Sequence, residues 1–221
     1  ALELTFGRGR DIKVYKDMLW NKPYPAKQHS EDTGDPLTFS SFNDFYSAFL
    51  KQVKFIVKNI AELYDKSDRV RAKYHPTPYL SCLVRGCIDK AKDVTNGGAE
   101  LRFATVEGVT FASTVDSLLA IKYLVYDKKI CSMEELLQAL KDNWKGYEKL
   151  QAIAKNKAPK YGRDDDEADA LAEDFMHYWT EEVWKYKTSL TDVQLRPGML
   201  SWNYWVSDGY ILSASPDGRE N

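Results

Sequence analysis

The chain has 221 residues, a formal net charge of −2 and 43% hydrophobic residues, enough for one sizeable core or for part of a larger one. Its 31 basic and 33 acidic residues leave no electrostatic footprint for nucleic acid. No apolar run approaches the roughly 18 residues of a membrane span, so we expect no membrane contact. Three cysteines form an odd, sparse set that fits a reducing, cytoplasmic compartment. Because the chain starts without Met and ends abruptly, we expect it to come from a longer protein.

The first half of the chain predicts mainly helix. Ala1–Thr5 resembles the last turn of a helix, and residues 10–38, which are polar and rich in proline and glycine, predict an irregular surface excursion. A long helix then begins at a cap provided by Ser40 or Ser41. We expect it to end near Tyr74, because the following His75-Pro76 pair leaves the α region. Its apolar residues recur every three or four positions along one stripe: Phe42, Phe45, Phe49, Val53, Ile56, Ile60 and Leu63.

The stretch from Asn96 to Lys129 predicts a turn, a strand, a glycine-bearing loop and an amphipathic helix. Thr77-Pro78 before it predicts a helix that continues to about Asp93. Glu107 lies next to Gly108 in the predicted loop, within an otherwise apolar stretch. A carboxylate costs free energy there unless it is paired or hydrogen-bonded. An active-site wall is often built in this way, from an irregular loop that carries the side chain and a rigid helix that holds the loop. The alternative is a glutamate at a strand edge that faces water.

The last third predicts three helices and a strand. Ser132 and Glu135 form a capping box that opens a helix to about Trp144. Further helices are expected over residues 147–155 and 167–186. Pro197-Gly198 is expected to break the pattern before a strand over residues 199–206, and residues 215–218 predict a turn. Two short strand regions cannot make a sheet of useful size alone, so the fold class is helix-rich α/β, and we expect the strands to pair with segments outside the chain.

Two further groups of residues are candidates for chemistry. Alternation along the last strand puts Leu200 and Trp202 on one face, where core packing is the alternative to substrate contact. Cys82 and Cys87, five residues apart on a predicted helix, point to different faces, which favours small buried side chains over metal ligands. The acidic run at residues 164–167 lacks the spacing of a calcium loop, so we predict no metal site.

Several segments together resemble the glycyl radical enzymes, the pyruvate formate-lyase-like family. The resemblance runs from about Gly34 to Arg219, and residues 10–32 match poorly. The segments are Thr33-Gly-Asp-Pro36, Pro76-Thr-Pro78, Cys87-Ile-Asp-Lys-Ala-Lys-Asp93, Gly97-Gly98, Asp116-Ser-Leu-Leu-Ala-Ile-Lys122, Leu124-Val-Tyr126, Ala158-Pro-Lys-Tyr-Gly162, Asp164-Asp-Asp166, Arg196-Pro-Gly198 and Ser215-Pro-Asp-Gly-Arg219.

The resemblance implies that residues 1–221 are part of a single barrel domain of ten strands surrounded by helices. The cysteine that forms a thiyl radical and the glycine that stores the radical would lie outside the chain, so the isolated fragment is expected to be inactive. No cofactor would bind the fragment itself. An activating enzyme that uses S-adenosylmethionine and an iron–sulfur cluster would install the glycyl radical, and the full-length protein would be a homodimer.

The resemblance also implies a function and a substrate site. Glu107, Leu200 and Trp202 match positions that face the substrate, and the hydroxyphenylacetate decarboxylases resemble this chain in having Glu at the first of them. We therefore expect a radical lyase that cleaves a C–C or C–heteroatom bond of a small molecule, with arylacetate decarboxylation favoured. Dehydration of a diol or hydroxy acid, C–S or C–N cleavage and formate acetyltransferase activity are the enzymatic alternatives. A helical scaffold derived from the family is the non-enzymatic one.

Overall fold

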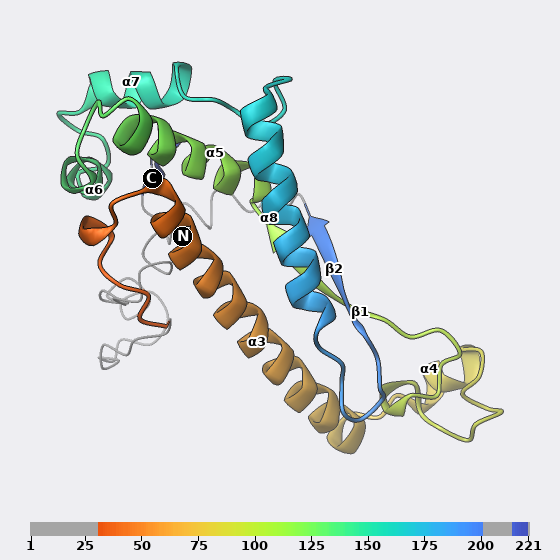
Figure 1. Ribbon diagram of the computed structural model, residues 1–221. Helices are drawn as coiled ribbons and strands as arrows, with labels where there is room; N and C mark the ends of the chain where they lie inside the picture. Colours follow the sequence, from red (N-terminus) through yellow and green to blue (C-terminus); the bar gives the residue numbers. More distant parts are fainter. Residues whose placement is uncertain (1–30, 201–213, 221) are drawn as a thin grey trace. The chain divides into compact units, whose positions relative to one another are not determined.

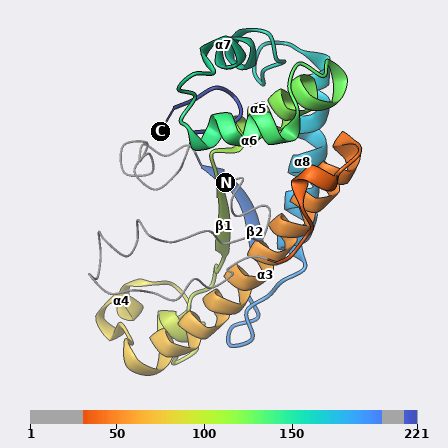
Figure 2. The same cartoon turned by 90° about the vertical axis from the view of Figure 1, so that its left-hand side faces the viewer.

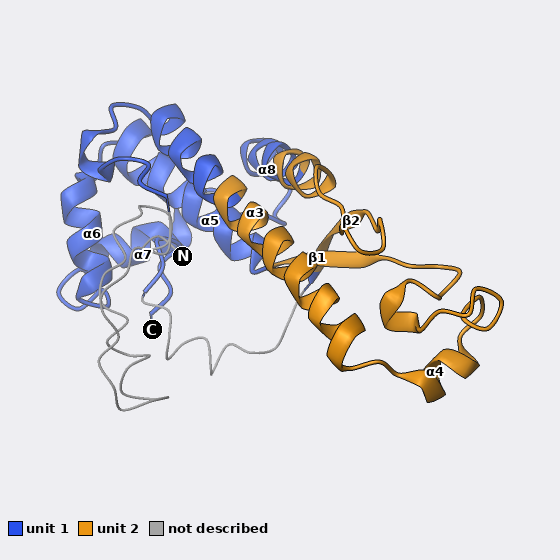
Figure 3. Cartoon of the chain, turned by 90° about the horizontal axis from the view of Figure 1, so that it is seen from below, with its two compact units in different colours: residues 1–53, 109–176, 200–221 blue, residues 54–108, 177–199 orange. Residues whose placement is uncertain are grey.

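The computed structural model describes residues 31–200 and 214–220 (Figure 1). The predicted helix end at Ala1–Thr5, most of the predicted excursion, residue Trp202 and the end of the predicted last strand lie outside these ranges. The chain divides into two compact units (Figure 3). Unit 1 comprises residues 1–53, 109–176 and 200–221, and unit 2 comprises residues 54–108 and 177–199. No helix of the described residues is long and apolar enough to cross a membrane.

The long helix α3 (Phe42–Tyr74) has the predicted bounds. At its start the Asp44 N–H donates to Ser41 Oγ (3.2 Å), and the Ser41 N–H donates to Asp44 Oδ2 (3.0 Å). This reciprocal pair satisfies two backbone donors that a helix start leaves free. Hydrogen bonds from the hydroxyls of Ser41 and Ser40 lower the pKa of the Asp44 carboxyl. The predicted cap is therefore confirmed.

Unit 1 is helical. It contains the short 3₁₀ turn η2 (Pro36–Thr38), helices α5 (Phe111–Ile121), α6 (Met133–Lys141) and α7 (Glu148–Asn156), and the first part of α8 (Asp166–Trp184). Ser132 caps α6 as predicted, because its side chain accepts a hydrogen bond from the Glu135 N–H. The core of the unit is a cluster of buried apolar side chains: Phe45, Leu118, Ile121, Leu124, Cys131, Met133, Leu136, Ala139, Leu140, Trp144, Leu150, Ala154 and Ala214.

The end of the predicted central helix is a π-helix, η4 (Lys122–Asp127), rather than a continuation of α5. The wider turn brings residues five apart to one side of the helix. Lys122 Nζ accordingly lies 2.6 Å from Asp127 Oδ2, and it also lies 2.5 Å from Glu167 Oε1 on α8. Partial burial opposes the charged ammonium, but the two carboxylates outweigh it and raise the pKa of Lys122.

Unit 2 contains the rest of α3, the short helix α4 (Pro78–Leu83), the 3₁₀ turn η3 (Val94–Asn96) and the end of α8. The predicted helix from Thr77 to about Asp93 is wrong in length. The chain turns at Gly86, which has a φ of +91°, and a Cβ there would lie 2.9 Å from the backbone nitrogen of Glu100. The helix ends at Leu83, where Val84 takes an extended conformation, and the turn that follows leaves Cys82 exposed while Cys87 is buried. The interpretation of Cys82 as a buried side chain was wrong.

The Asp93 carboxylate ties the segment after α4 together. Its Oδ1 accepts from the N–H (2.9 Å) and the hydroxyl (2.6 Å) of Thr95. Its Oδ2 accepts from the Thr77 N–H (3.0 Å) and the Ser81 hydroxyl (2.7 Å). The hydrogen bonds, that of the Thr95 hydroxyl first, outweigh desolvation and lower the pKa of Asp93 to about 2.

Because the carboxyl pKa is lower in the folded segment than the ordinary 3.8, folding favours the charged form. Its contribution to stability is complete at pH values above the ordinary pKa and is lost as the pH falls towards 2. We expect Asp93→Asn to speed amide hydrogen exchange at Thr77 and Thr95 near pH 6, and the difference from the natural protein to shrink below pH 4. Asp89→Asn, an exposed acid in the same segment, is the control. An equal difference at every pH would contradict this role of the charge.

Unit 2 also holds the sheet, formed by β1 (Ala104–Val109) and β2 (Leu195–Leu200), which run in the same direction (Figures 1 and 2). Two predictions were wrong here. Glu107 and Gly108 lie inside β1 rather than in a loop, and β2 begins at Leu195 and includes Pro197-Gly198. Pro lacks the N–H that a central strand needs, but a strand at the edge of a sheet tolerates it, and β2 has one strand neighbour among the described residues.

Candidate functional site

The open face of β1 and β2 carries the Glu107 carboxylate. Along β1 the burial alternates, so that Ala104 and Val106 are buried while Thr105 and Glu107 are exposed. Gly198 of β2 lies beside them on the same face. A Cβ on Gly198 would stand 2.5 Å from Glu107 Oε2 and 2.7 Å from Thr105 Cγ2. The Glu107 carboxylate therefore lies across the backbone of the neighbouring strand.

The opposite face of the two strands is packed. A Cβ on Gly108 would meet the sulfur of Met199 at 2.6 Å and the ring of Trp179 at 3.5 Å. Trp179 lies on α8 and is 8% exposed. The helix therefore covers one side of the sheet within unit 2, whereas no described element covers the Glu107 side.

A basic group lies on the open face as well. The Arg196 guanidinium stands over the Phe103 ring at 5.1 Å, a cation–π contact between β2 and the residue that precedes β1. Carboxylate, hydroxyl and guanidinium groups thus follow one another along the face. Such a face can accept and donate hydrogen bonds to a small polar molecule.

The structure places two of the three substrate residues that the sequence predicted. Glu107 is on the open face, and Leu200 is half-buried at the end of β2, on the side of Gly198 by alternation. Trp202 lies outside the described residues. Sequence reasoning missed Thr105, Arg196 and Gly198, although alternation through Arg196, Gly198 and Leu200 was a usable signal once β2 was known to start at Leu195.

Loop contacts to α3 hold the start of β2. The Ser189 N–H and hydroxyl donate to Asp65 Oδ1 at 2.6 and 2.8 Å. These two bonds, with the charge of Arg69, lower the pKa of Asp65 despite desolvation. Thr191 reaches Asp68 Oδ2 at 3.4 Å, and Arg71 lies 3.7 Å from its Oδ1. These contacts hold the loop that precedes β2 against α3.

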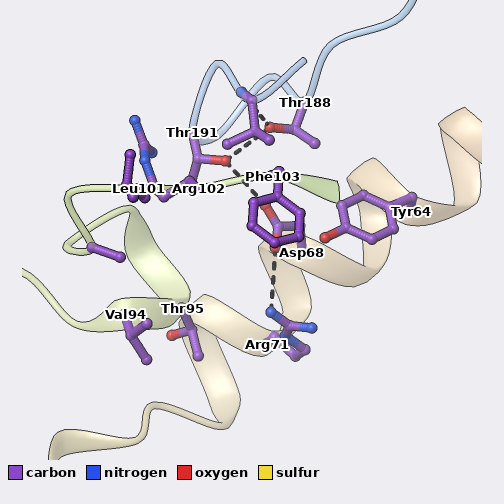
Figure 4. A pocket seen from close by; sticks show the side chains of 12 residues that line it. Tyr64, Asp68, Arg71, Val94, Thr95, Leu101, Arg102, Phe103, Thr188 and Thr191 are labelled. Atoms are coloured by element: carbon purple, nitrogen blue, oxygen red, sulfur yellow. Dashed lines mark hydrogen bonds and ion pairs between the residues drawn. The ribbon is translucent and has the colours of Figure 1, made fainter. Parts of the chain in front are cut away.

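A hollow of about 220 Å³ lies around Asp68 in unit 2 (Figure 4). Figure 4 shows the Asp68 carboxylate joined to Arg71 on one side and to Thr191 on the other, and Thr191 joined to Thr188. Because Asp68 and the two threonines already bind one another, we interpret the hollow as part of the packing of the loop before β2. The open strand face is the better candidate for a functional site.

The described residues offer no other reactive centre. They contain no cluster of three or more His, Cys, Asp or Glu side chains that could hold a metal ion. Cys131 lies in the core of unit 1, where burial raises the pKa of its thiol to about 11. Cys87 is buried against Gly98, and Cys82 is exposed on α4. None of the three lies on the strand face of Glu107.

The sequence of the chain matches a known protein family. The family model described as "Pyruvate formate lyase-like" matches residues 1–207. Trans-4-hydroxy-L-proline dehydratase of Clostridioides difficile is 37% identical over 218 residues, which are 99% of this chain and 26% of that protein. (2S)-3-sulfopropanediol dehydratase of Klebsiella oxytoca is 34% identical over 196 residues, 88% of this chain and 24% of that protein.

A solved structure shows the same fold. The crystal structure of hydroxyproline dehydratase from Clostridioides difficile with trans-4-hydroxy-L-proline bound superimposes with a TM-score of 0.86 at 36% identity, over 99% of this chain and 26% of that one. The chain spans about a quarter of the length of the curated relatives it matches. The predicted fold class, a helix-rich α/β segment of a barrel, is confirmed. The chain belongs to the pyruvate formate lyase-like family of glycyl radical enzymes.

Proposed function

We propose that this chain is a segment of a glycyl radical lyase that removes water from a small hydroxylated substrate, and that Glu107 accepts a hydrogen bond from a substrate hydroxyl. The observation that carries the proposal is the carboxylate on the open strand face, in a chain that aligns almost end to end with a dehydratase. An ionised carboxylate is a strong acceptor for a hydroxyl, and a hydrogen bond to a charged group stabilises a complex by about 1.5–3 kcal/mol.

In this proposal the chain supplies one wall of the site within a single barrel domain. The thiyl cysteine and the radical glycine lie in parts of the parent protein outside this chain, and a partner enzyme that uses S-adenosylmethionine installs the radical. That radical supplies the hydrogen abstraction that begins the reaction. Glu107 orients the substrate hydroxyl, Arg196 adds a donor on the same face, and Leu200 and Trp202 continue the wall along the chain. The parent is a cytoplasmic homodimer.

Dehydration has the better support, because both curated relatives described above are named dehydratases. The decarboxylation of an arylacetate, which the sequence favoured through Glu107, stays a prediction. The two reactions differ in what leaves the substrate, water in one case and carbon dioxide in the other, so the products separate them.

The test uses the full-length protein. It is activated without oxygen by its activating enzyme, the glycyl radical is measured by electron paramagnetic resonance, and products from trans-4-hydroxy-L-proline, glycerol and 4-hydroxyphenylacetate are identified by mass. We expect a radical and a product that has lost water. Carbon dioxide from 4-hydroxyphenylacetate would replace dehydration by decarboxylation. Absence of any radical would contradict the enzyme proposal and favour a scaffold role.

A further inference from the structure

Gly198 lies within the strand β2, where glycine lowers stability unless another group needs the space that a side chain would fill. Glycine weakens a strand, and in strands it often marks a place where another group approaches the backbone closely. Gly198 is absent from the residues with a positive φ, so its backbone conformation is open to any residue. What the position requires is therefore the missing side chain.

The missing side chain leaves the volume that the Glu107 carboxyl group occupies. A Cβ on Gly198 would stand 2.5 Å from Oε2 and 2.8 Å from Cδ of Glu107, closer than real Cβ contacts come. Any side chain at this position would have to displace the carboxylate. Thr105 Cγ2, at 2.7 Å, is the other neighbour on this face.

The two strand glycines serve opposite faces. Gly108 faces Met199 and Trp179 on the packed side, so a Cβ there would disturb the core of unit 2. Gly198 faces the exposed Glu107 and Thr105 side chains. A side chain added at position 198 would therefore contact the Glu107 carboxylate and would leave the packed face of the sheet unchanged.

We propose that Gly198 is a positioning residue for Glu107, an inference that rests on the proposed role of this carboxylate. The bare backbone of β2 lets the carboxylate lie flat against the sheet, which sets its depth and leaves the space in front of it for a substrate. A methyl group at position 198 lifts the carboxylate into that space. A displacement of about 1 Å in an active site can lower the rate roughly 100-fold.

The experiment uses the activated full-length protein and whichever of trans-4-hydroxy-L-proline and glycerol it turns over. Gly198→Ala is expected to lower kcat/KM by roughly 10- to 100-fold at unchanged radical content. In a Glu107→Ala background the same change is expected to cost less than about twofold, because no carboxylate remains to be displaced. Gly108→Ala, the matched control on the packed face, is expected to have the same effect with or without the Glu107 side chain.

Two activity outcomes would overturn the proposal. One is an equal loss from Gly198→Ala in both backgrounds. The other is recovery of the Gly198→Ala variant by Thr105→Ser, which would make the Thr105 methyl group the displaced neighbour. A crystal structure of the full-length Gly198→Ala protein gives a readout that needs no activity, and a Glu107 carboxylate still lying on β2 would also overturn it. If that structure shows a displaced carboxylate while Glu107→Ala keeps full activity, the positioning holds and the proposed role of Glu107 in function fails.

Discussion

Replacing Glu107 with Ala in the full-length protein is expected to lower kcat/KM by roughly 10- to 100-fold, because a hydrogen bond from the substrate to a charged acceptor is lost. Such a bond contributes about 1.5–3 kcal/mol, and each 1.4 kcal/mol corresponds to a factor of about ten. Glu107 is exposed in this chain and lies against Gly198, so its removal takes away no core contact. The loss should therefore appear in activity and not in stability.

Glu107→Gln separates the charge of this side chain from its shape. Gln keeps one acceptor oxygen and the length of the side chain, so it fits across Gly198 as Glu107 does. We expect a loss smaller than that of Glu107→Ala if the carboxylate accepts a hydrogen bond from the substrate. A loss as large as that of Glu107→Ala would instead indicate that the carboxylate takes up a proton as a base.

Glu100→Ala is the matched control for both variants. Glu100 is an exposed acid of the same unit, its only ion pair among the described residues is a loose one to Arg85 at 3.8 Å, and it lies before β1 rather than on the strand face. It should leave kcat/KM unchanged. Full activity of Glu107→Gln and Glu107→Ala would remove Glu107 from the site.

Local signals predicted much of the fold. The serine cap of α3 predicted its start, the His75-Pro76 pair predicted its end, and the capping box at Ser132 predicted the start of α6, since these signals act within one or two turns. The error at α4 had a tertiary cause. The helix ends at Leu83, and the chain then turns at Gly86 against the backbone of Glu100, a contact that helix propensity and periodicity do not describe.

The candidate site was less predictable for a related reason. Glu107 stands out as a carboxylate in an apolar stretch, and the family resemblance supported it. Gly198, by contrast, looked like a strand breaker together with Pro197. Its pairing with Glu107 depends on the register between two strands that are far apart in the sequence, and local patterns carry no such register. The contacts from Asp65 and Asp68 that hold β2 in place are equally non-local.

Replacing Trp144 with Ala is expected to lower the stability of unit 1 by about 3–5 kcal/mol, the usual cost of deleting a large buried aromatic side chain. Trp144 is 1% exposed within the core of the unit, and its indole N–H donates to the Arg219 carbonyl at 3.2 Å. Trp144→Phe keeps most of the packing and loses the hydrogen bond, so about 1 kcal/mol is expected. Amide hydrogen exchange in α6 and α7 of the full-length protein measures both effects.

The backbone at Trp144 adds a sharper test. Its φ is +63°, a left-handed conformation that costs a residue with a side chain about 1–2 kcal/mol and costs glycine almost nothing. Trp144→Gly should therefore be less destabilising than Trp144→Ala, the reverse of the order in a helix. Trp184→Ala, at a tryptophan that is 57% exposed, should change the exchange rates little. If Trp144→Gly proves the worse of the two, the left-handed turn is not what the fold requires at this position, and ring packing alone explains the residue.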